Sequence, residues 1–122
     1  MSLAFPDDWS GLRFPHVRAE LLNYLKDATK PDLCLRTHEV EFLVHFMFDD
    51  HDFGPNDTNI GDILFDSEEA SALLHFVETL DRAIGPRTKQ LSELTLDDWN
   101  PVAKVAEETY SHLARNGLPH YG

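Results

Sequence analysis

Apolar residues recur at helical spacing in four stretches of the chain, which predicts four amphipathic helices. The first begins at Phe14-Pro15, because proline is tolerated in the first turn of a helix. It ends before Lys30-Pro31, because the residue that precedes a proline disfavours helical backbone angles. The apolar positions of this first stripe are Val17, Leu21, Leu22, Leu25 and Ala28.

The clearest of the four helices is predicted from Ser67 to Ile84. Asp66 is a good N-cap residue, and Glu69 follows it at the spacing of a capping box. Phe65 and Ala70 stand where a hydrophobic staple would join them. Gly85-Pro86 stops the helix. Its apolar stripe consists of Ala70, Leu73, Leu74, Val77, Leu80 and Ile84.

The last helix is predicted to begin at Asn100-Pro101 and to end at Asn116-Gly117. A polar connection over 87–98 precedes it, and Trp99 is expected to anchor its start. The leucines of the connection are expected to point inward: Leu91, Leu94 and Leu96. The helix itself is expected to bury Val102, Ala103, Ala106, Tyr110 and Leu113.

The stretch from Thr37 to Asp50 has an ambiguous pattern. Apolar positions such as Val40, Val44 and Phe48 fit helical spacing, but they also alternate as in a strand, and β-branched and aromatic residues are typical of strands. We favour a helix with Thr37 as its N-cap, because the run exceeds ten residues. The alternative is a short strand over 40–48.

Together these patterns predict an all-α fold, a small antiparallel bundle of about four helices. The alternative fold class is α+β, with the strand at 40–48. The 122 residues suit one domain over 1–122, with 1–11 as a poorly ordered N-terminal extension.

The charge is concentrated in the middle of the chain. From Thr37 to Asp81 there are 12 carboxylates and no Lys or Arg, whereas the flanking segments balance, so the net charge of −12 comes from this acidic block. A phosphate backbone requires basic residues, so nucleic acid is excluded as a partner. The sequence has neither a membrane span nor a signal-like N-terminus, so we expect a cytoplasmic protein.

The acidic block is either a solvated face or a docking surface for a basic protein. The 52–59 segment is a loop by composition. The phenylalanines beside these carboxylates offer more apolar surface than one helix face should bury. Such residues are more often part of the core, but together with the carboxylates they could form an aromatic and acidic docking patch. The candidate partner-binding residues are Asp49, Asp50, Asp52, Asp57, Asp62, Phe46 and Phe48.

A metal site is the alternative use of the same segment. His45 and Asp49 are four residues apart and would share a helix face, and His51 is close by. No further metal ligand stands at a recognisable spacing. Carboxylates near a helix C-terminus are slightly unfavourable, and nearby histidines more often serve only to moderate that negative charge. An EF-hand loop that starts at Asp49 fails, because Phe53 and Ile60 fall at ligand positions.

The residues that could carry catalysis are few, so we favour a protein that is not an enzyme. Cys34 lies between two leucines, which is typical of a buried hydrophobe and not of an activated thiolate. No nucleophile elbow, phosphate loop or dinucleotide fingerprint is present, and no cofactor is expected.

Three stretches of the chain resemble a family of small, acidic, uncharacterised bacterial proteins of the actinobacterial type. They are Val44-His45-Phe46-Met47-Phe48-Asp49-Asp50, Ile60-Gly61-Asp62-Ile63-Leu64 with the helix start that follows, and Trp99-Asn100-Pro101-Val102-Ala103. The His51-Asp52 pair and the Asn100-Pro101 step depart from the pattern of the family. The resemblance implies a helical, cytoplasmic-type domain and no established activity.

The leading hypothesis is therefore a non-enzymatic interaction protein whose acidic block docks a basic partner, in the manner of an immunity protein or another neutraliser. One rival is a metal-binding protein that uses His45, Asp49 and His51. The other rival is a helical homodimer of structural role, with a self-complementary Phe-rich surface.

Overall fold

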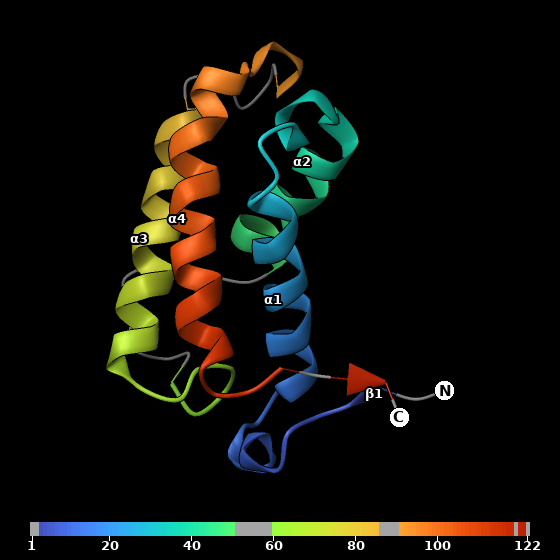
Figure 1. The fold of residues 1–122 in the computed structure, drawn as a ribbon, viewed down its shortest axis with the longest axis vertical. Helices are drawn as coiled ribbons and strands as arrows, with labels where there is room; N and C mark the ends of the chain where they lie inside the picture. The colour runs from blue at the N-terminus through green and yellow to red at the C-terminus, as the bar shows by residue number, and fades with distance from the viewer. Residues whose placement is uncertain (1–2, 51–59, 86–90, 119, 122) are drawn as a thin grey trace.

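The computed structural model describes residues 3–50, 60–85, 91–118 and 120–121, and the helices in this part of the chain form an all-α bundle (Figure 1). The α-helices are α1 (Pro15–Ala28), α2 (Thr37–Val44), α3 (Ser67–Ile84) and α4 (Leu96–Ala114). Short 3₁₀ segments are η1 (Asp7–Gly11), η2 (Leu33–Leu35) and η6 (Leu91–Glu93). A π-helical segment, η3 (His45–Asp50), continues α2. The predicted all-α bundle is confirmed.

Helix α4 lies between α1 and α3 and runs antiparallel to both (Figure 1). Helix α2 lies at the end of α1, and η2 connects the two helices (Figure 1). At the opposite end of the bundle the chain termini meet, where β1 (Leu3–Ala4) and β2 (His120–Tyr121) pair antiparallel over two residues each. None of the helices within the described residues is long and apolar enough to cross a membrane.

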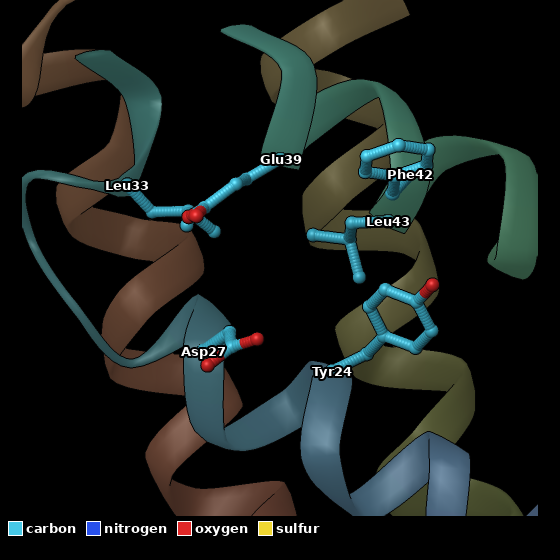
Figure 2. Close-up of a pocket in the computed structure, with 6 residues that line it drawn as sticks. All are labelled: Tyr24, Asp27, Leu33, Glu39, Phe42 and Leu43. Atoms are coloured by element: carbon cyan, nitrogen blue, oxygen red, sulfur yellow. The ribbon is translucent and has the colours of Figure 1, made fainter. Parts of the chain in front are cut away.

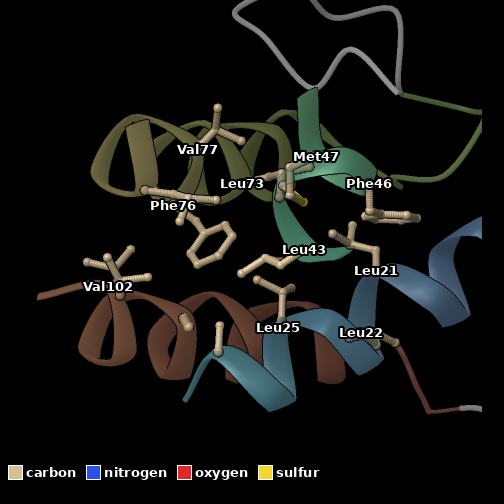
Figure 3. Packing of buried hydrophobic residues seen from close by; sticks show 14 of the residues in the cluster. Leu21, Leu22, Leu25, Leu43, Phe46, Met47, Leu73, Phe76, Val77 and Val102 are labelled. Carbon is tan, nitrogen blue, oxygen red and sulfur yellow. The ribbon is translucent and has the colours of Figure 1, made fainter. Parts of the chain in front are cut away.

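The hydrophobic core fills the space between the four helices. Leu21 and Leu25 of α1, Leu43 of α2, Phe76 of α3 and Val102 of α4 belong to one cluster, and Figure 3 shows Leu25 beside Leu43 and Phe76 in the space between α3 and α4. All five are at most 1% exposed. The apolar stripe predicted for α3 omits Phe76, which stands three residues after Leu73 on the same face.

Both long helices begin with a side-chain cap. At α3 the Asp66 carboxylate accepts a hydrogen bond from the Glu69 N–H at 2.9 Å, which confirms Asp66 as the N-cap. At α4 the Thr95 hydroxyl accepts from the Asp98 N–H, and the Asp98 carboxylate accepts from the Thr95 N–H. This capping box starts α4 at Leu96, so the prediction of a start at Asn100-Pro101 was wrong. Leu96, expected to point inward, is 47% exposed.

We expect Asp66→Ala to lower the free energy of unfolding by about 1 kcal/mol, because it removes the acceptor for an otherwise unpaired N–H. Urea denaturation of the variant and the parent measures the difference. Ser71→Ala, an exposed change on the same helix, is the control and should stay within about 0.5 kcal/mol of the parent. An unchanged midpoint for Asp66→Ala would mean that the cap contributes nothing.

The ambiguous 37–50 stretch is helical, so the strand alternative over 40–48 was wrong. Val40 and Leu43 are buried on one face, as helical spacing requires. Thr37 is the first helical residue and not the N-cap. The N-cap position belongs to Arg36, whose carbonyl accepts from the N–H groups of both Glu39 and Val40. Segment η2 ends immediately before Arg36, which fixes where the new helix can begin.

The N-terminal segment contributes a large aromatic residue to the core. Trp9, in η1, is fully buried, and its ring stacks on Phe5 at a centroid distance of 5.5 Å. Its Nε1–H donates to the carbonyl of Asn116, just beyond α4, at 2.9 Å. Both chain ends are thus joined at the same end of the bundle.

Candidate binding pocket

A buried ion pair links three of the helices and is the most polar feature of the core. Arg18 of α1 and Glu69 of α3 form a two-point contact, with Nη1 at 2.8 Å from Oε1 and Nη2 at 2.7 Å from Oε2. Both side chains are 0% exposed. Arg18 also donates to the carbonyls of Ile63 and Leu113, and Glu69 accepts from the Phe65 N–H and the Asn116 side-chain amide.

The guanidinium of Arg18 is also enclosed by aromatic rings. Its central carbon lies 5.2 Å from the ring centroid of Trp9 and 4.7 Å from that of Phe65. Cation–π attraction of this kind strengthens when the cation is removed from water. The contacts of the pair thus connect η1, α1, α3 and the end of α4.

The environment of Glu69 favours its charged form. Burial by itself raises the pKa of this carboxyl group, but the hydrogen bonds from Arg18, Phe65 and Asn116, with the charge of Arg18, outweigh burial. The net result is a pKa below the ordinary value for glutamate. Glu69 therefore stays ionised at neutral pH and is not poised as a proton donor or acceptor.

The sequence signal for this pair is a charged residue on each of two apolar helix stripes. Arg18 stands three residues before Leu21, and Glu69 stands four residues before Leu73, so each charge occupies a position on an apolar stripe. We explained Glu69 as part of a capping box with Asp66. In the structure its carboxylate instead accepts from the N–H of Phe65, one residue earlier, and from Arg18.

The described surface contains a small pocket between α1 and α2, with a volume of about 140 Å³ (Figure 2). Two leucines of the core, two aromatic rings and two carboxylates line it: Tyr24 and Asp27 of α1, Leu33 of η2, and Glu39, Phe42 and Leu43 of α2. Pockets for drug-sized ligands are about 300–1,000 Å³, so this pocket suits a single side chain better than a whole small molecule.

The pocket walls combine apolar and acidic groups. Phe42 is 63% exposed, an unusual state for a phenylalanine. The Tyr24 ring of α1 stacks on buried Phe46 at a centroid distance of 4.6 Å, which holds it in position. The carboxylates of Asp27 and Glu39 come from different helices and are seen near the hollow in Figure 2. None of the six lining residues is basic.

Two cations stand beside the pocket and bind its carboxylates. Lys30 Nζ lies 3.3 Å from Oδ1 of Asp27, and Arg36 Nη1 lies 3.2 Å from Oε2 of Glu39. The four side chains of these two pairs are 45–52% exposed. Exposed ion pairs of this kind contribute only about 0–1 kcal/mol, so an incoming cation can replace them.

The candidate partner-binding residues predicted from the sequence do not gather in this pocket. Phe46 is 2% exposed and belongs to the core, whereas Phe48 is 37% exposed. Asp62 is half-buried, and its carbonyl accepts from the Phe14 N–H. Asp49 and Asp50 lie in η3, but their side chains are outside the described part of the structure. Asp52 and Asp57 are outside the described residues altogether.

The metal hypothesis concerns residues that are mostly outside the described structure. His45 is exposed at the start of η3, His51 is not described, and the side chain of Asp49 is not described. Among the described residues, no group of three His, Cys, Asp or Glu side chains is arranged to hold a metal ion. Cys34 is 1% exposed, and burial raises the pKa of its thiol, which disfavours the reactive thiolate.

Comparisons with protein-family models, with curated proteins and with solved structures found no match to this chain. The resemblance to acidic actinobacterial-type proteins therefore stays a prediction.

Proposed function

We propose that this chain is a non-enzymatic interaction protein whose acidic surface docks a basic protein partner. The observation that carries the proposal is the concentration of charge between residues 37 and 81. Six of its carboxylates are exposed on described elements: Glu39, Glu41, Asp66, Glu68, Glu78 and Asp81. Such a surface raises the rate of encounter with a basic protein and disfavours acidic competitors.

The burial pattern supports the same proposal. Among the described residues, four of the six exposed carboxylates of the block stand on α3 or at its start, and three of these four, Glu68, Glu78 and Asp81, form no ion pair. Unpaired like charges destabilise a folded chain through repulsion, so a block of this size has a cost that a binding role would offset. An immunity-like or neutralising protein is one version of this function.

The proposal predicts that neutralising the 50–57 carboxylates slows association with the partner. The test variant is Asp50→Asn/Asp52→Asn/Asp57→Asn, and partners are first captured on immobilised parent protein at low salt and then purified. We expect the association rate constant to fall by about tenfold and the dissociation rate to change little, since steering acts on encounter. Raising salt from 0.1 M to 1 M shortens the Debye length from about 10 Å to about 3 Å. This change should weaken binding of the partner to the parent protein.

A matched control neutralises three exposed carboxylates of α4, outside the block: Asp97→Asn/Glu107→Gln/Glu108→Gln. It removes the same net charge and should slow association much less. Equal rates for parent and test variant at both salt concentrations would refute docking through the 50–57 carboxylates, and salt-independent rates would refute docking through the block as a whole. Size-exclusion chromatography with light scattering is run beside these measurements, because a stable dimer would favour the homodimer alternative.

A further inference from the structure

We infer that the pocket between α1 and α2 binds one lysine side chain of the basic partner. The inference rests on the proposed function and adds where an anchoring residue of the partner is held and which residue it is. A short list of buried anchors usually dominates the affinity of a protein interface, and such anchors fill pockets. This pocket is of side-chain size.

The lining of the pocket matches the two parts of a lysine side chain. Leu33 and Leu43, each 1% exposed, line the pocket with apolar atoms, and the rings of Tyr24 and Phe42 line it as well. A lysine stem buries its methylene groups on such surfaces while its charged end remains near water. The ring of Phe42, which is 63% exposed, would cover the methylene stem of the lysine and would also attract its ammonium group by a cation–π interaction.

The arrangement of the carboxylates favours lysine over arginine. Asp27 and Glu39 stand on different helices, and each already gives one oxygen to a neighbouring cation. Arginine binds best when both oxygens of one carboxylate face its planar fork. An ammonium group is a compact charge with three rotatable donors, so it suits a pocket whose carboxylate oxygens come from two separate side chains better than a planar fork does.

Because neighbouring cations compete for the carboxylates of the pocket, removing one of them should strengthen binding. Arg36 competes for Glu39, so removing Arg36 should strengthen binding of an incoming ammonium, whereas removing Glu39 should weaken it. A pocket that merely attracts apolar groups would respond to neither change. Generic attraction to the acidic protein would respond equally to loss of any carboxylate.

The experiment titrates the protein with n-butylammonium, the end group of a lysine side chain, and follows the ¹³C-labelled methyl signals of Leu33 and Leu43 by NMR. We expect saturable shifts with a dissociation constant on the order of 10 mM, as befits a ligand of five heavy atoms. The neutral isostere 1-butanol should bind more weakly. The peptide acetyl-Gly-Lys-Gly-amide should produce the same shifts, and its arginine counterpart smaller ones.

Glu39→Gln should weaken butylammonium binding by about two- to fivefold, and Arg36→Gln should strengthen it by a similar factor, the range that an exposed ion pair contributes. Glu78→Gln on α3 is the matched control and should leave binding unchanged. Unchanged methyl signals of Leu73 and Val102 show that each variant keeps its fold.

Absent methyl shifts would overturn the inference, and so would equal shifts with butanol or identical effects of Glu39→Gln and Glu78→Gln. Binding of butylammonium without binding of the lysine peptide would also overturn it, in favour of a small free amine. Larger shifts with the arginine peptide would reject lysine as the occupant. These outcomes leave salt-dependent capture by the acidic block untouched, so failure here is distinguishable from failure of the proposed function.

Discussion

Breaking the buried ion pair should be the most destabilising polar change in the described structure. We expect Glu69→Gln and Arg18→Met each to lower the free energy of unfolding by about 3–5 kcal/mol, because each leaves an uncompensated charge or unpaired groups in the core. Glutamine can still accept from Arg18 Nη1 and the Phe65 N–H, but its amide would face Arg18 Nη2 with a donor. Urea denaturation measures both losses, and Glu68→Gln, an exposed neighbour, is the control.

The double variant Arg18→Met/Glu69→Gln distinguishes a charge pair from two independent contacts. Its loss should be smaller than the sum of the single losses, because removing both charges leaves neither uncompensated. The loss should nevertheless remain above about 1 kcal/mol, since the carbonyls of Ile63 and Leu113 lose their donor. Additive single losses, or losses below 1 kcal/mol, would contradict this account.

The lowered pKa of Glu69 gives the same pair a pH signature. A carboxyl group whose pKa is lower in the folded than in the unfolded state stabilises the fold above its unfolded pKa. That stabilisation is lost as the pH falls through the folded value. The parent should therefore lose stability below about pH 4.5, the ordinary value for glutamate, and Glu69→Gln should lose less over the same range. If stability fell with pH by the same amount in both proteins, protonation of Glu69 would not contribute to acid unfolding.

Truncating Trp99 should cost as much as breaking the ion pair. The ring is fully buried near the start of α4, and its Nε1–H donates to the carbonyl of Ala28, the last residue of α1, at 3.1 Å. Trp99→Ala leaves a cavity and an unpaired carbonyl, so we expect a loss of about 3–5 kcal/mol. At this chain length, such a loss lowers Tm by roughly 10–20 °C.

Trp99→Phe separates the two contributions. It keeps most of the apolar volume but removes the donor, so we expect a loss of about 1–3 kcal/mol. Leu96→Ala, three residues earlier and 47% exposed, is the control and should change Tm little. Trp9 remains as a fluorescent reporter of unfolding in every variant. A Tm for Trp99→Ala within 3 °C of the parent would show that the ring contributes little to the core.

Much of the fold was predictable because local sequence rules agreed with the tertiary structure. Helix α3 has the predicted bounds, Ser67–Ile84, because Asp66 caps it and its apolar stripe is long and regular. Helix α1 begins at Pro15, as predicted from the tolerance of proline in a first turn. The start of α4 was misplaced, because Pro101 suggested a helix start while the capping box at Thr95 and Asp98 went unrecognised.

The candidate pocket was not predictable from the sequence. Its carboxylates, Asp27 and Glu39, are 12 residues apart, and neither belongs to a motif. Phe42 alternates with Phe46 and Phe48 in the sequence, and only the helical course of 37–50 buries Phe46 and leaves Phe42 exposed. The lining depends on how α2 crosses the end of α1, which is decided by packing of the core.

The sequence by itself determined the helical class, the location of most helices and the segregation of acidic charge, because these follow from periodicity, caps and composition within short windows. Only the tertiary structure decided which polar side chains are buried together and which apolar ones stay outside. Arg18 and Glu69 are 51 residues apart and meet because α1 and α3 are held on either side of α4. A contact of this kind depends on the mutual placement of whole helices, which no local pattern specifies.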